Sequence, residues 1–231
     1  MMDYQKEYIE KNPTLHLEDT DKKLKEVLKV IDYSNNFKSM VDIGCGAGLL
    51  TLKLKKALKI ENVTGVDLSK HMILHAQNLD NSNSIKWINN DFRSLMNLQE
   101  FDLSIAIDIV EHVEDDEEIL EVLSKISKYS VIKVPLENSV MNRVLNFLNI
   151  HDTFTETKNQ FGHINHYNFF QIRRKIEKDF NILNYNCISM PKRRTKIWEV
   201  GRRIWLPLGL LSKTIMTYFG GGFAVFFVES K

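Results

Sequence analysis

Three glycines at alternate positions carry the clearest chemical signal in the chain: Gly44, Gly46 and Gly48. They follow an apolar run over 40–43 and precede a predicted helix over 49–58, in the order strand, tight turn, helix. Because glycine has no Cβ atom, a ligand can approach this backbone closely, and the first amides of the helix are free to bind it. The pattern G-x-G-x-G differs from the dinucleotide-binding pattern G-x-G-x-x-G, because Leu49 stands where the third glycine of that pattern falls.

Two acidic residues after later strands add the groups that an adenosine-bearing ligand needs. Asp67 ends the apolar run 63–66, about 20 residues after the turn, where nucleotide-binding α/β folds place an acid that accepts hydrogen bonds from ribose hydroxyls. Asp91 follows the run 85–88, and its carboxylate can accept from an adenine amino group, with Phe92 near the ring. Together these residues predict a site for adenosine at one edge of a sheet.

A fourth motif, which follows a strand over 103–107, narrows the choice of ligand. The segments DIGCGAG, GVDLS, NDF and FDLSIAIDIVEHVED, in this order between residues 41 and 116, resemble the class I S-adenosylmethionine-dependent methyltransferases. In particular they resemble the small-molecule branch that includes the ubiquinone-biosynthesis O-methyltransferases. The resemblance implies S-adenosylmethionine as cofactor and a Rossmann-like, doubly wound α/β fold. That fold has a mostly parallel seven-stranded sheet, an antiparallel last strand and a lid insertion after strand five.

The resemblance also carries the family's cofactor contacts onto residues at the ends of four strands. The glycine turn would face the methionine and ribose parts, and the backbone after strand four would face the methionine amino group. The adenine would lie between Leu68 and the pair Asp91 and Phe92, and Asp42 would order the turn. The complete set of cofactor-binding candidates is Asp42, Gly44, Cys45, Gly46, Gly48, Asp67, Leu68, Asp91, Phe92, Ala106 and Ile107.

His112 follows strand four, where the resemblance places the transferred methyl group. An imidazole that titrates near neutral pH can take a proton from a hydroxyl acceptor as the methyl arrives. His112 is therefore the candidate catalytic residue. The alternative is that it only helps to shape the pocket.

Asp108, Glu111 and His112 also form a candidate metal site. They resemble the Glu-x-x-Glu-His motif with which ubiquinone-pathway and small-RNA 2′-O-methyltransferases hold a divalent cation, but the first acid here is an aspartate, one methylene shorter. His163 or His166 would supply a further ligand. A mixed set of carboxylate and imidazole suits Mg²⁺ and Mn²⁺ weakly and Zn²⁺ tolerably. A divalent cation is therefore an alternative, and not the expectation.

The remaining elements are predicted from hydrophobic periodicity around this core, in a single domain over 1–231. Strand five, over 131–134, is expected to end at Pro135, and the lid insertion after it to be irregular apart from a helix over 138–149. The N-terminal part, 1–38, is expected to be a helical cover with a helix over 15–33, and the cofactor core, 39–135, to contain helices over 70–79 and 116–128. The lid occupies 136–168. The C-terminal part, 169–231, is expected to contain a helix over 168–180 and strands over 182–188 and 223–228.

Composition and charge limit the possible partners and location. The 231 residues have a formal net charge of +1, so no global field attracts nucleic acid. Cys45 and Cys187 are expected to be free thiols in a reducing, cytoplasmic compartment, and the polar N-terminus predicts no secretion signal. The apolar and aromatic segment 198–218 is interrupted by Pro207 and Gly209. We therefore expect it to form a lid or a buried helix, or a helix on a membrane surface, rather than a helix that spans a membrane.

The sequence therefore predicts an enzyme that methylates a small organic acceptor at an oxygen atom. The aromatic residues of the lid and of segment 198–218 favour an apolar acceptor. One alternative is an RNA 2′-O-methyltransferase with a bound divalent cation, which the basic residues after Arg173 keep open. Another is a protein that binds the cofactor and serves as a non-catalytic partner.

Overall fold

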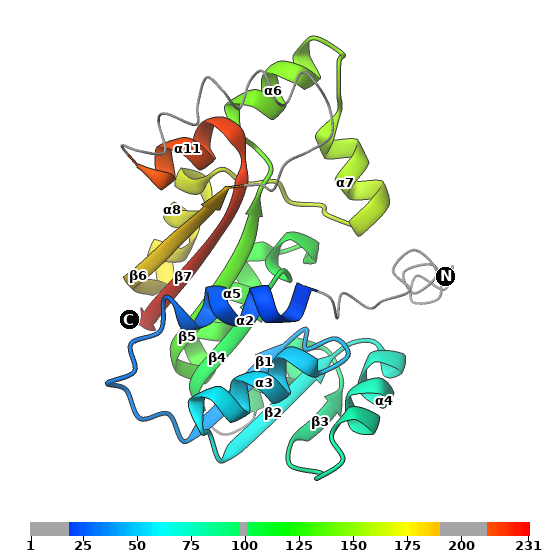
Figure 1. Ribbon diagram of the computed structural model, residues 1–231, viewed down its shortest axis with the longest axis vertical. Coiled ribbons are helices and arrows are strands. Elements are labelled where there is room, and N and C mark those ends of the chain that lie inside the picture. Colours follow the sequence, from blue (N-terminus) through cyan, green and yellow to red (C-terminus); the bar gives the residue numbers. More distant parts are fainter. Residues whose placement is uncertain (1–18, 98–100, 190–211) are drawn as a thin grey trace.

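A seven-stranded sheet in the order β3-β2-β1-β4-β5-β7-β6 forms the centre of the computed structural model, which describes residues 19–97, 101–189 and 212–231 (Figure 1). Its strands are β1 (Ser39–Ile43), β2 (Asn62–Asp67), β3 (Lys86–Asn89), β4 (Phe101–Ile107), β5 (Ser127–Leu136), β6 (Phe180–Ser189) and β7 (Gly222–Ser230). β7 is antiparallel to β5 and β6, and the pairs among β1 to β5 are parallel. This confirms the predicted α/β sheet with an antiparallel last strand.

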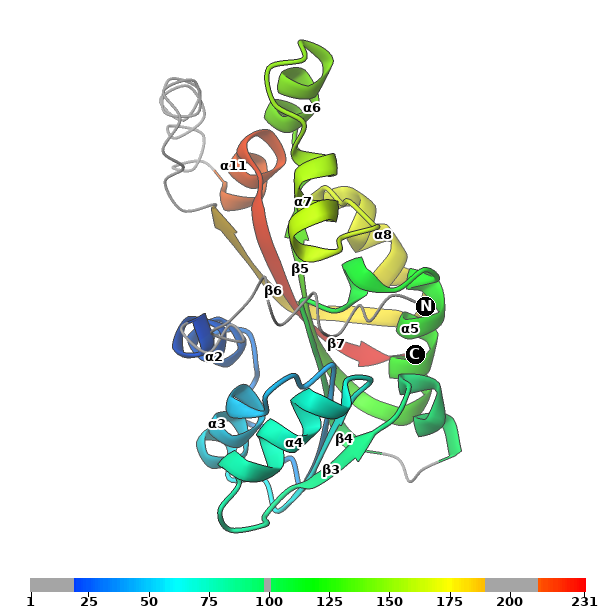
Figure 2. The same ribbon diagram turned by 90° about the vertical axis from the view of Figure 1, so that its right-hand side faces the viewer.

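Helices cover both faces of this sheet (Figure 2). One face carries α2 (Thr20–Leu28), α3 (Leu49–Leu58) and α4 (Lys70–Leu79), and the other carries α5 (Asp116–Ile126) and α8 (Phe169–Asp179). Successive side chains of a strand point to opposite faces, so the neighbours Ile105 and Ala106 of β4 belong to different apolar cores. The crossovers bring the carboxyl ends of β1, β2 and β4 to one edge of the sheet.

Side chains at the helix starts show why these helices begin where they do. The Asp115 carboxylate accepts hydrogen bonds from the amides of Glu117 and Glu118 at the start of α5. Asn168 and Gln171 form a capping box at the start of α8, each side chain bonding the backbone of the other residue.

Strand five is longer than predicted. β5 pairs with β4 as far as Lys133 and with β7 as far as Leu136, so Pro135 lies where the strand has passed the end of β4. A proline has no N–H to donate, and it is tolerated where one side of a strand is no longer paired. The prediction that Pro135 ends the strand was wrong for this reason.

The insertion between β5 and α8 is also more regular than predicted. The helix expected over 138–149 is α6 (Val140–Phe147), but α7 (Thr153–Phe161) was not predicted. The Asp152 carboxylate accepts from the amides of Phe154 and Thr155 at the start of α7, and Gly162 ends the helix with a φ of 81°. Both signals are present in the sequence, but the weak apolar periodicity between them concealed the helix.

Both ends of the chain include residues outside the described ranges. The helix expected over 15–33 is α2, which ends at Leu28, so the predicted end at residue 33 was wrong; residues 15–18 lie outside the described ranges. α11 (Lys213–Gly220) covers the end of segment 198–218, and residues 198–211 also lie outside those ranges. Among the helices that the structure describes, none has the length and apolar character needed to cross a membrane. Cys45 and Cys187 are buried free thiols.

Candidate functional site

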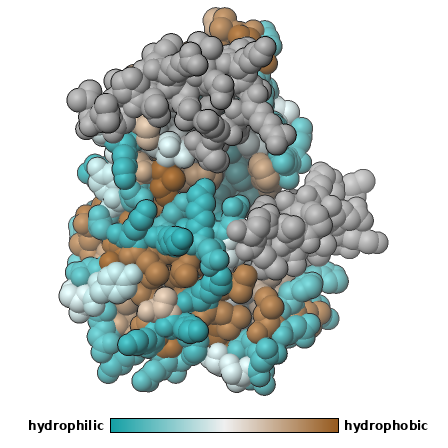
Figure 3. Space-filling model, in the orientation of Figure 1, coloured by the Kyte–Doolittle hydropathy of each residue, from teal (hydrophilic) through white to brown (hydrophobic). Residues whose placement is uncertain are grey.

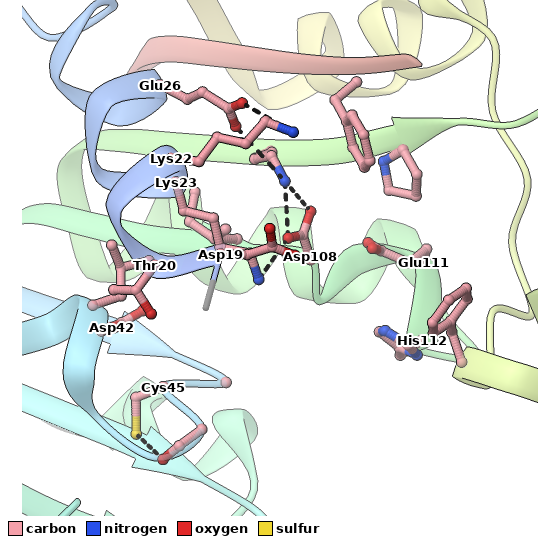
Figure 4. Close-up of a pocket in the computed structure, with 18 of the residues that line it drawn as sticks. Asp19, Thr20, Lys22, Lys23, Glu26, Asp42, Cys45, Asp108, Glu111 and His112 are labelled. Atoms are coloured by element: carbon pink, nitrogen blue, oxygen red, sulfur yellow. Dashed lines mark hydrogen bonds and ion pairs between the residues drawn. The ribbon is translucent and has the colours of Figure 1, made fainter. Parts of the chain in front are cut away.

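Two cavities lie at the carboxyl ends of β1 and β4. The first has a volume of ≈ 470 Å³, and its lining includes the last residue of β2, Asp67, and residues that follow β2 and β3: Leu68, Asp91 and Phe92. The second has a volume of ≈ 320 Å³, and its lining includes residues from α2, β5 and the insertion after β5 (Figure 4). The residues that line both cavities are Gly44, Gly46, Met72, Asp108 and His112. The two cavities are therefore adjacent, and the glycine turn and the residues after β4 lie between them.

The glycine turn depends on backbone conformations that other residues rarely adopt. Gly46 has a φ of +53°, and a Cβ atom there would meet nothing within 4 Å, so this backbone faces open space. Gly48 has a φ of +81°, and a Cβ atom there would lie 2.6 Å from the Cβ of Ala76 and from the ring of Trp87. The turn thus leaves bare backbone toward the cavities and packs tightly against α4 and β3.

The Asp67 carboxylate is held by backbone amides at the rim of the first cavity. Its two oxygens accept hydrogen bonds from the amides of Gly46, at 2.9 Å, and Ser69, at 2.8 Å. Burial raises the pKa of Asp67, and the two amides oppose this shift. A carboxylate oxygen can accept more than one hydrogen bond, so both oxygens keep capacity for the hydroxyls of a ligand.

The residues expected around an adenine lie on the same cavity, in a more exposed setting. Leu68 is 68% exposed and projects from the loop after β2. Asp91 forms an ion pair with Arg93, at 3.0 Å, and the Arg93 guanidinium lies 4.7 Å from the centre of the Phe92 ring. A ligand that uses both Asp91 and Phe92 therefore has to share them with Arg93 or displace it.

The other predicted cofactor residues lie on the second cavity or in the core. Cys45, Gly48, Ile107 and the buried Asp42 line the second cavity. Ala106 lines neither cavity, because its side chain is packed in the apolar core on the α5 face.

Asp108 belongs to a network of buried charges. Lys133 Nζ lies 2.7 Å and 2.9 Å from its two carboxylate oxygens, and Lys23 Nζ from α2 lies 3.0 Å from one of them (Figure 4). Lys133 is 4% exposed and also faces Glu26, at 4.0 Å. The two lysines hold the pKa of Asp108 far below its usual range, although desolvation opposes this shift. Asp108 also has a positive φ of 55°, a conformation that is costly for a residue with a Cβ atom.

Glu111 has the opposite environment, although it is three residues away. It is completely buried, and within the described part of the chain neither of its carboxylate oxygens has a hydrogen-bond partner. Burial, together with the charge of Asp108, raises the pKa of Glu111 well above its usual value. One ligand atom each from Glu111, His112 and His163 lies within 4.8 Å of the others. An orphaned carboxylate beside two imidazoles fits a divalent cation.

The structure therefore brings together Glu111 and His112 from the predicted metal set, but it places Asp108 with the lysines instead. His163 joins the cluster, whereas His166 does not. Burial and the nearby His163 lower the pKa of His112 to about 4, so this imidazole is neutral at physiological pH and a weak base. The low pKa makes His112 better suited to accept a cation or a hydrogen bond than to remove a proton.

Comparison with known proteins gives a family for the cofactor core. Residues 40–129 match a family model described as a methyltransferase domain. The mitochondrial ubiquinone biosynthesis O-methyltransferase of Dictyostelium discoideum is 32% identical over 103 residues, which are 39% of this chain and 32% of that protein. The ubiquinone biosynthesis O-methyltransferase of Hydrogenovibrio crunogenus is 30% identical over 95 residues, 39% of each chain. The match thus spans less than two fifths of these curated relatives.

Solved structures extend the likeness in fold to nearly the whole chain. A complex of the Haloferax volcanii Trm112 methyltransferase activator with a methyltransferase matches with a TM-score of 0.65, at 13% identity, over 98% of this chain and 95% of that chain. Magnesium protoporphyrin IX methyltransferase from Synechocystis, with bound S-adenosylhomocysteine, matches with a TM-score of 0.60, at 15% identity, over 100% and 89%. Residues 40–129 are thus similar to a methyltransferase domain, and the described part of the chain has the fold of these methyltransferase structures.

Several side chains that line the two cavities or support them were not predicted from the sequence. Lys133 lies within the apolar run of β5, where a charged residue in a buried strand is itself a signal of a paired charge. Lys23 and Glu26 lie on the polar side of a helix and gave no such signal. Glu137 follows β5 directly, and only the tertiary structure shows that it is buried and bonded to two histidines of the insertion.

Replacing Asp42 by asparagine should change how stability depends on pH. Burial raises the pKa of Asp42 from 3.8 to about 7, although the Thr51 hydroxyl donates a hydrogen bond to it. Between these pH values the folded protein holds a proton that the unfolded chain has released, so the free energy of unfolding falls as pH rises. The variant Asp42→Asn keeps an acceptor for Thr51 and lacks this titration.

We expect the difference in unfolding free energy, wild type minus Asp42→Asn, to fall by about 2 kcal/mol between pH 5 and pH 7. Urea denaturation across this range measures it, because the titrations of all other groups cancel in the difference. A difference that stays constant with pH would show that Asp42 ionises normally in the folded protein.

Proposed function

We propose that this protein transfers a methyl group from S-adenosylmethionine to an oxygen atom of a small organic acceptor. The observation that carries this proposal is the pair of adjacent cavities that share the glycine turn, Met72 and His112. The first cavity offers the groups that an adenosine requires, and the second, at ≈ 320 Å³, has the size of a small-molecule pocket. A donor and an acceptor bound in the two cavities would meet at the shared residues.

In this proposal the chain acts mainly by alignment. The acceptor oxygen attacks the methyl carbon, the S–C bond breaks with its electron pair going to sulfur, and the acceptor hydroxyl loses its proton. The methyl group of a sulfonium is already activated, so orienting the two reactants supplies much of the rate. His112 lies between the cavities as a neutral imidazole and would orient the acceptor hydroxyl by accepting its hydrogen bond, and the proton would pass to solvent water as the methyl group arrives.

Oxygen is the preferred acceptor atom because the curated relatives are named as O-methyltransferases. The near-zero net charge of the chain argues against a large RNA substrate, which needs many phosphate contacts. A non-catalytic partner protein would need only the cofactor cavity, so this alternative does not explain the second cavity beside it. A phenol or catechol with an apolar substituent has both the hydroxyl group that O-methylation requires and the apolar character that the aromatic residues of the lid favour.

Incubation with methyl-labelled S-adenosylmethionine tests the proposed activity. We expect label to be transferred to the oxygen of one or more members of a panel of phenols and catechols, identified by mass spectrometry of the products. Transfer of label to RNA from a cell extract, with none to the panel or to the small molecules of that extract, would support the RNA methyltransferase instead. Binding of S-adenosylhomocysteine without any transfer would support the non-catalytic partner.

The variant Asp67→Asn tests the proposed cofactor site. The wild-type carboxylate would accept two charge-assisted hydrogen bonds from ribose hydroxyls, and the amide would keep at most one neutral bond. We expect binding of S-adenosylhomocysteine to weaken by about 30-fold or more, corresponding to about 2 kcal/mol, in isothermal calorimetry. The matched control Asp32→Asn changes an exposed turn residue and should bind as the wild type does. Equal affinities for both variants would contradict the assignment of Asp67.

We further propose a cytoplasmic location with peripheral contact to a membrane, in agreement with an apolar acceptor. The end of α6 and the loop after it expose four large apolar side chains, and Phe147 is 85% exposed. The others are Val144, Leu148 and Ile150. In Figure 3 apolar surface stands at the top of the molecule, where Figure 1 places α6. α6 also contacts α11, which follows the basic residues of the segment 192–203 in the chain.

Sedimentation with vesicles of mixed neutral and anionic lipids tests this contact. We expect the wild type to sediment with the vesicles, and the double variant Phe147→Ser, Leu148→Ser to bind at least about tenfold more weakly, because two apolar side chains no longer enter the interface. The control Leu74→Ser removes an exposed leucine from α4 and should leave binding unchanged. Wild-type protein that stays in solution would contradict the proposal.

A further inference from the structure

Helix α2 gives the second cavity a charged wall. Lys22, Lys23 and Glu26 line this cavity, and Figure 4 shows them extending from α2 toward the part of the cavity that holds Asp108. Lys133 reaches the same place from β5 and is 4% exposed. Charges that leave water need a partner inside the protein, so a cavity for a purely apolar acceptor would not require such a wall. The wall therefore points to a charged group on the acceptor.

The ammonium groups of this wall outnumber the carboxylates that pair with them. Lys133 Nζ lies 2.7 Å and 2.9 Å from the two oxygens of Asp108, and Lys23 Nζ lies 3.0 Å from one of them. The second carboxylate of the group is Glu26, 4.0 Å from both Lys22 Nζ and Lys133 Nζ. Lys22, Lys23 and Lys133 thus share two carboxylates, which leaves one positive charge in excess.

The other acids that line this cavity do not remove the excess. Among the residues that the structure describes, none of them forms an ion pair within 4.0 Å with the three lysines. Asp19 is exposed at the start of α2, where water and salt screen its charge. The rest have partners of their own: Asp42 accepts from the Thr51 hydroxyl, Glu111 lies beside two histidines, and Glu137 is bonded to two histidines.

Two of the three ammonium groups also have N–H donors without an acceptor. An ammonium has three such donors, and Lys133 uses two of them on Asp108. Glu26, at 4.0 Å from Lys133 and from Lys22, lies beyond hydrogen-bond distance of both. Lys22 makes no hydrogen bond within the described part of the chain, and its side chain is 50% exposed. It would therefore turn toward a ligand without leaving a buried partner.

The ring of Phe223 shows that these two lysines reach the same part of the cavity. Lys133 Nζ lies 4.4 Å from the centre of this ring, and Lys22 Nζ lies 5.7 Å from it. Phe223, Pro135 and Phe161 line the same cavity and add apolar surface to it. An aromatic acceptor would place its ring against this apolar surface and a negatively charged group between the two ammonium groups.

We propose that the second cavity selects an acceptor that carries a carboxylate, bound between Lys22 and Lys133, and that Lys22 is the specificity-determining residue. This inference rests on the proposed function, which assigns the acceptor to this cavity, and it narrows the acceptor to a hydroxylated aromatic acid. A carboxylate carries the single negative charge that balances the excess. A phosphate monoester, with a charge of about −1.5 to −2 at pH 7, would exceed it.

Two catechols of nearly equal size, dihydrocaffeate and its primary amide, test the inference by binding. Calorimetry on the full chain saturated with S-adenosylhomocysteine measures both affinities, so the result does not depend on turnover. We expect the wild type to bind the acid at least about tenfold more tightly than the amide, because hydrogen bonds between an ammonium and a carboxylate are stronger than those to a neutral amide.

Three variants of α2 test the role of Lys22. Lys22→Met keeps an apolar side chain of similar length and removes the charge, so the preference for the acid should fall to within about threefold. Lys22→Glu should reverse the preference, because a second carboxylate would repel the acid. The matched control Lys25→Met removes the same charge from an exposed position of α2 that lines neither cavity, and it should keep the wild-type preference.

Binding of S-adenosylhomocysteine by every protein distinguishes the possible failures. A wild type that binds S-adenosylhomocysteine, but binds the acid no more tightly than the amide or not at all, overturns the inference and leaves the proposed function standing. A wild type that does not bind S-adenosylhomocysteine overturns both. A preference that persists in Lys22→Met, or that falls equally in Lys25→Met, would overturn the assignment of Lys22.

Discussion

The hydrogen bond between the Gly46 amide and the Asp67 carboxylate, 2.9 Å long, joins the turn after β1 to the end of β2. It forms because the glycines of the turn adopt positive φ values, which direct backbone N–H groups toward the sheet edge. Both cavities include Gly44 and Gly46 in their lining, so the shape of each depends on this turn. Tight packing of Gly48 against Ala76 and Trp87 keeps the turn in place.

Around this turn, pairing of buried charges decides what each acid can do. Asp108 and Glu111 lie three residues apart, and Glu111 is completely buried whereas the Asp108 side chain is 21% exposed. Lys133 and Lys23 keep Asp108 ionised, whereas Glu111 has no such partner and burial favours its protonated form. The same physical rule explains Glu137, whose pKa two histidines lower to about 2 although burial opposes the shift. Of these three carboxyl groups, Asp108 and Glu137 are thus kept ionised, whereas the protonated form of Glu111 is favoured.

Local patterns made much of the fold predictable. Alternation of apolar strands and helical stripes is a property of neighbouring residues, and it placed β1, α3, β2 and α4 within one or two residues of their observed bounds. The errors occurred where a neighbour in space changes a local rule. Pro135 continues β5 because β4 has already ended beside it, and α7 forms because Asp152, Gly162 and the contact of Thr157 with Glu137 compensate for weak periodicity.

By itself the sequence determined the order of strands and helices, the glycine turn and the acids after β2 and β3, since each depends on residues that are close along the chain. Only the tertiary structure decided which charges meet. Lys23 reaches Asp108 across 85 residues of chain, and Glu137 reaches His163 across 26. Such contacts have no periodicity to reveal them, because they depend on how the sheet brings distant strand ends together and on the cost of leaving any buried charge unpaired.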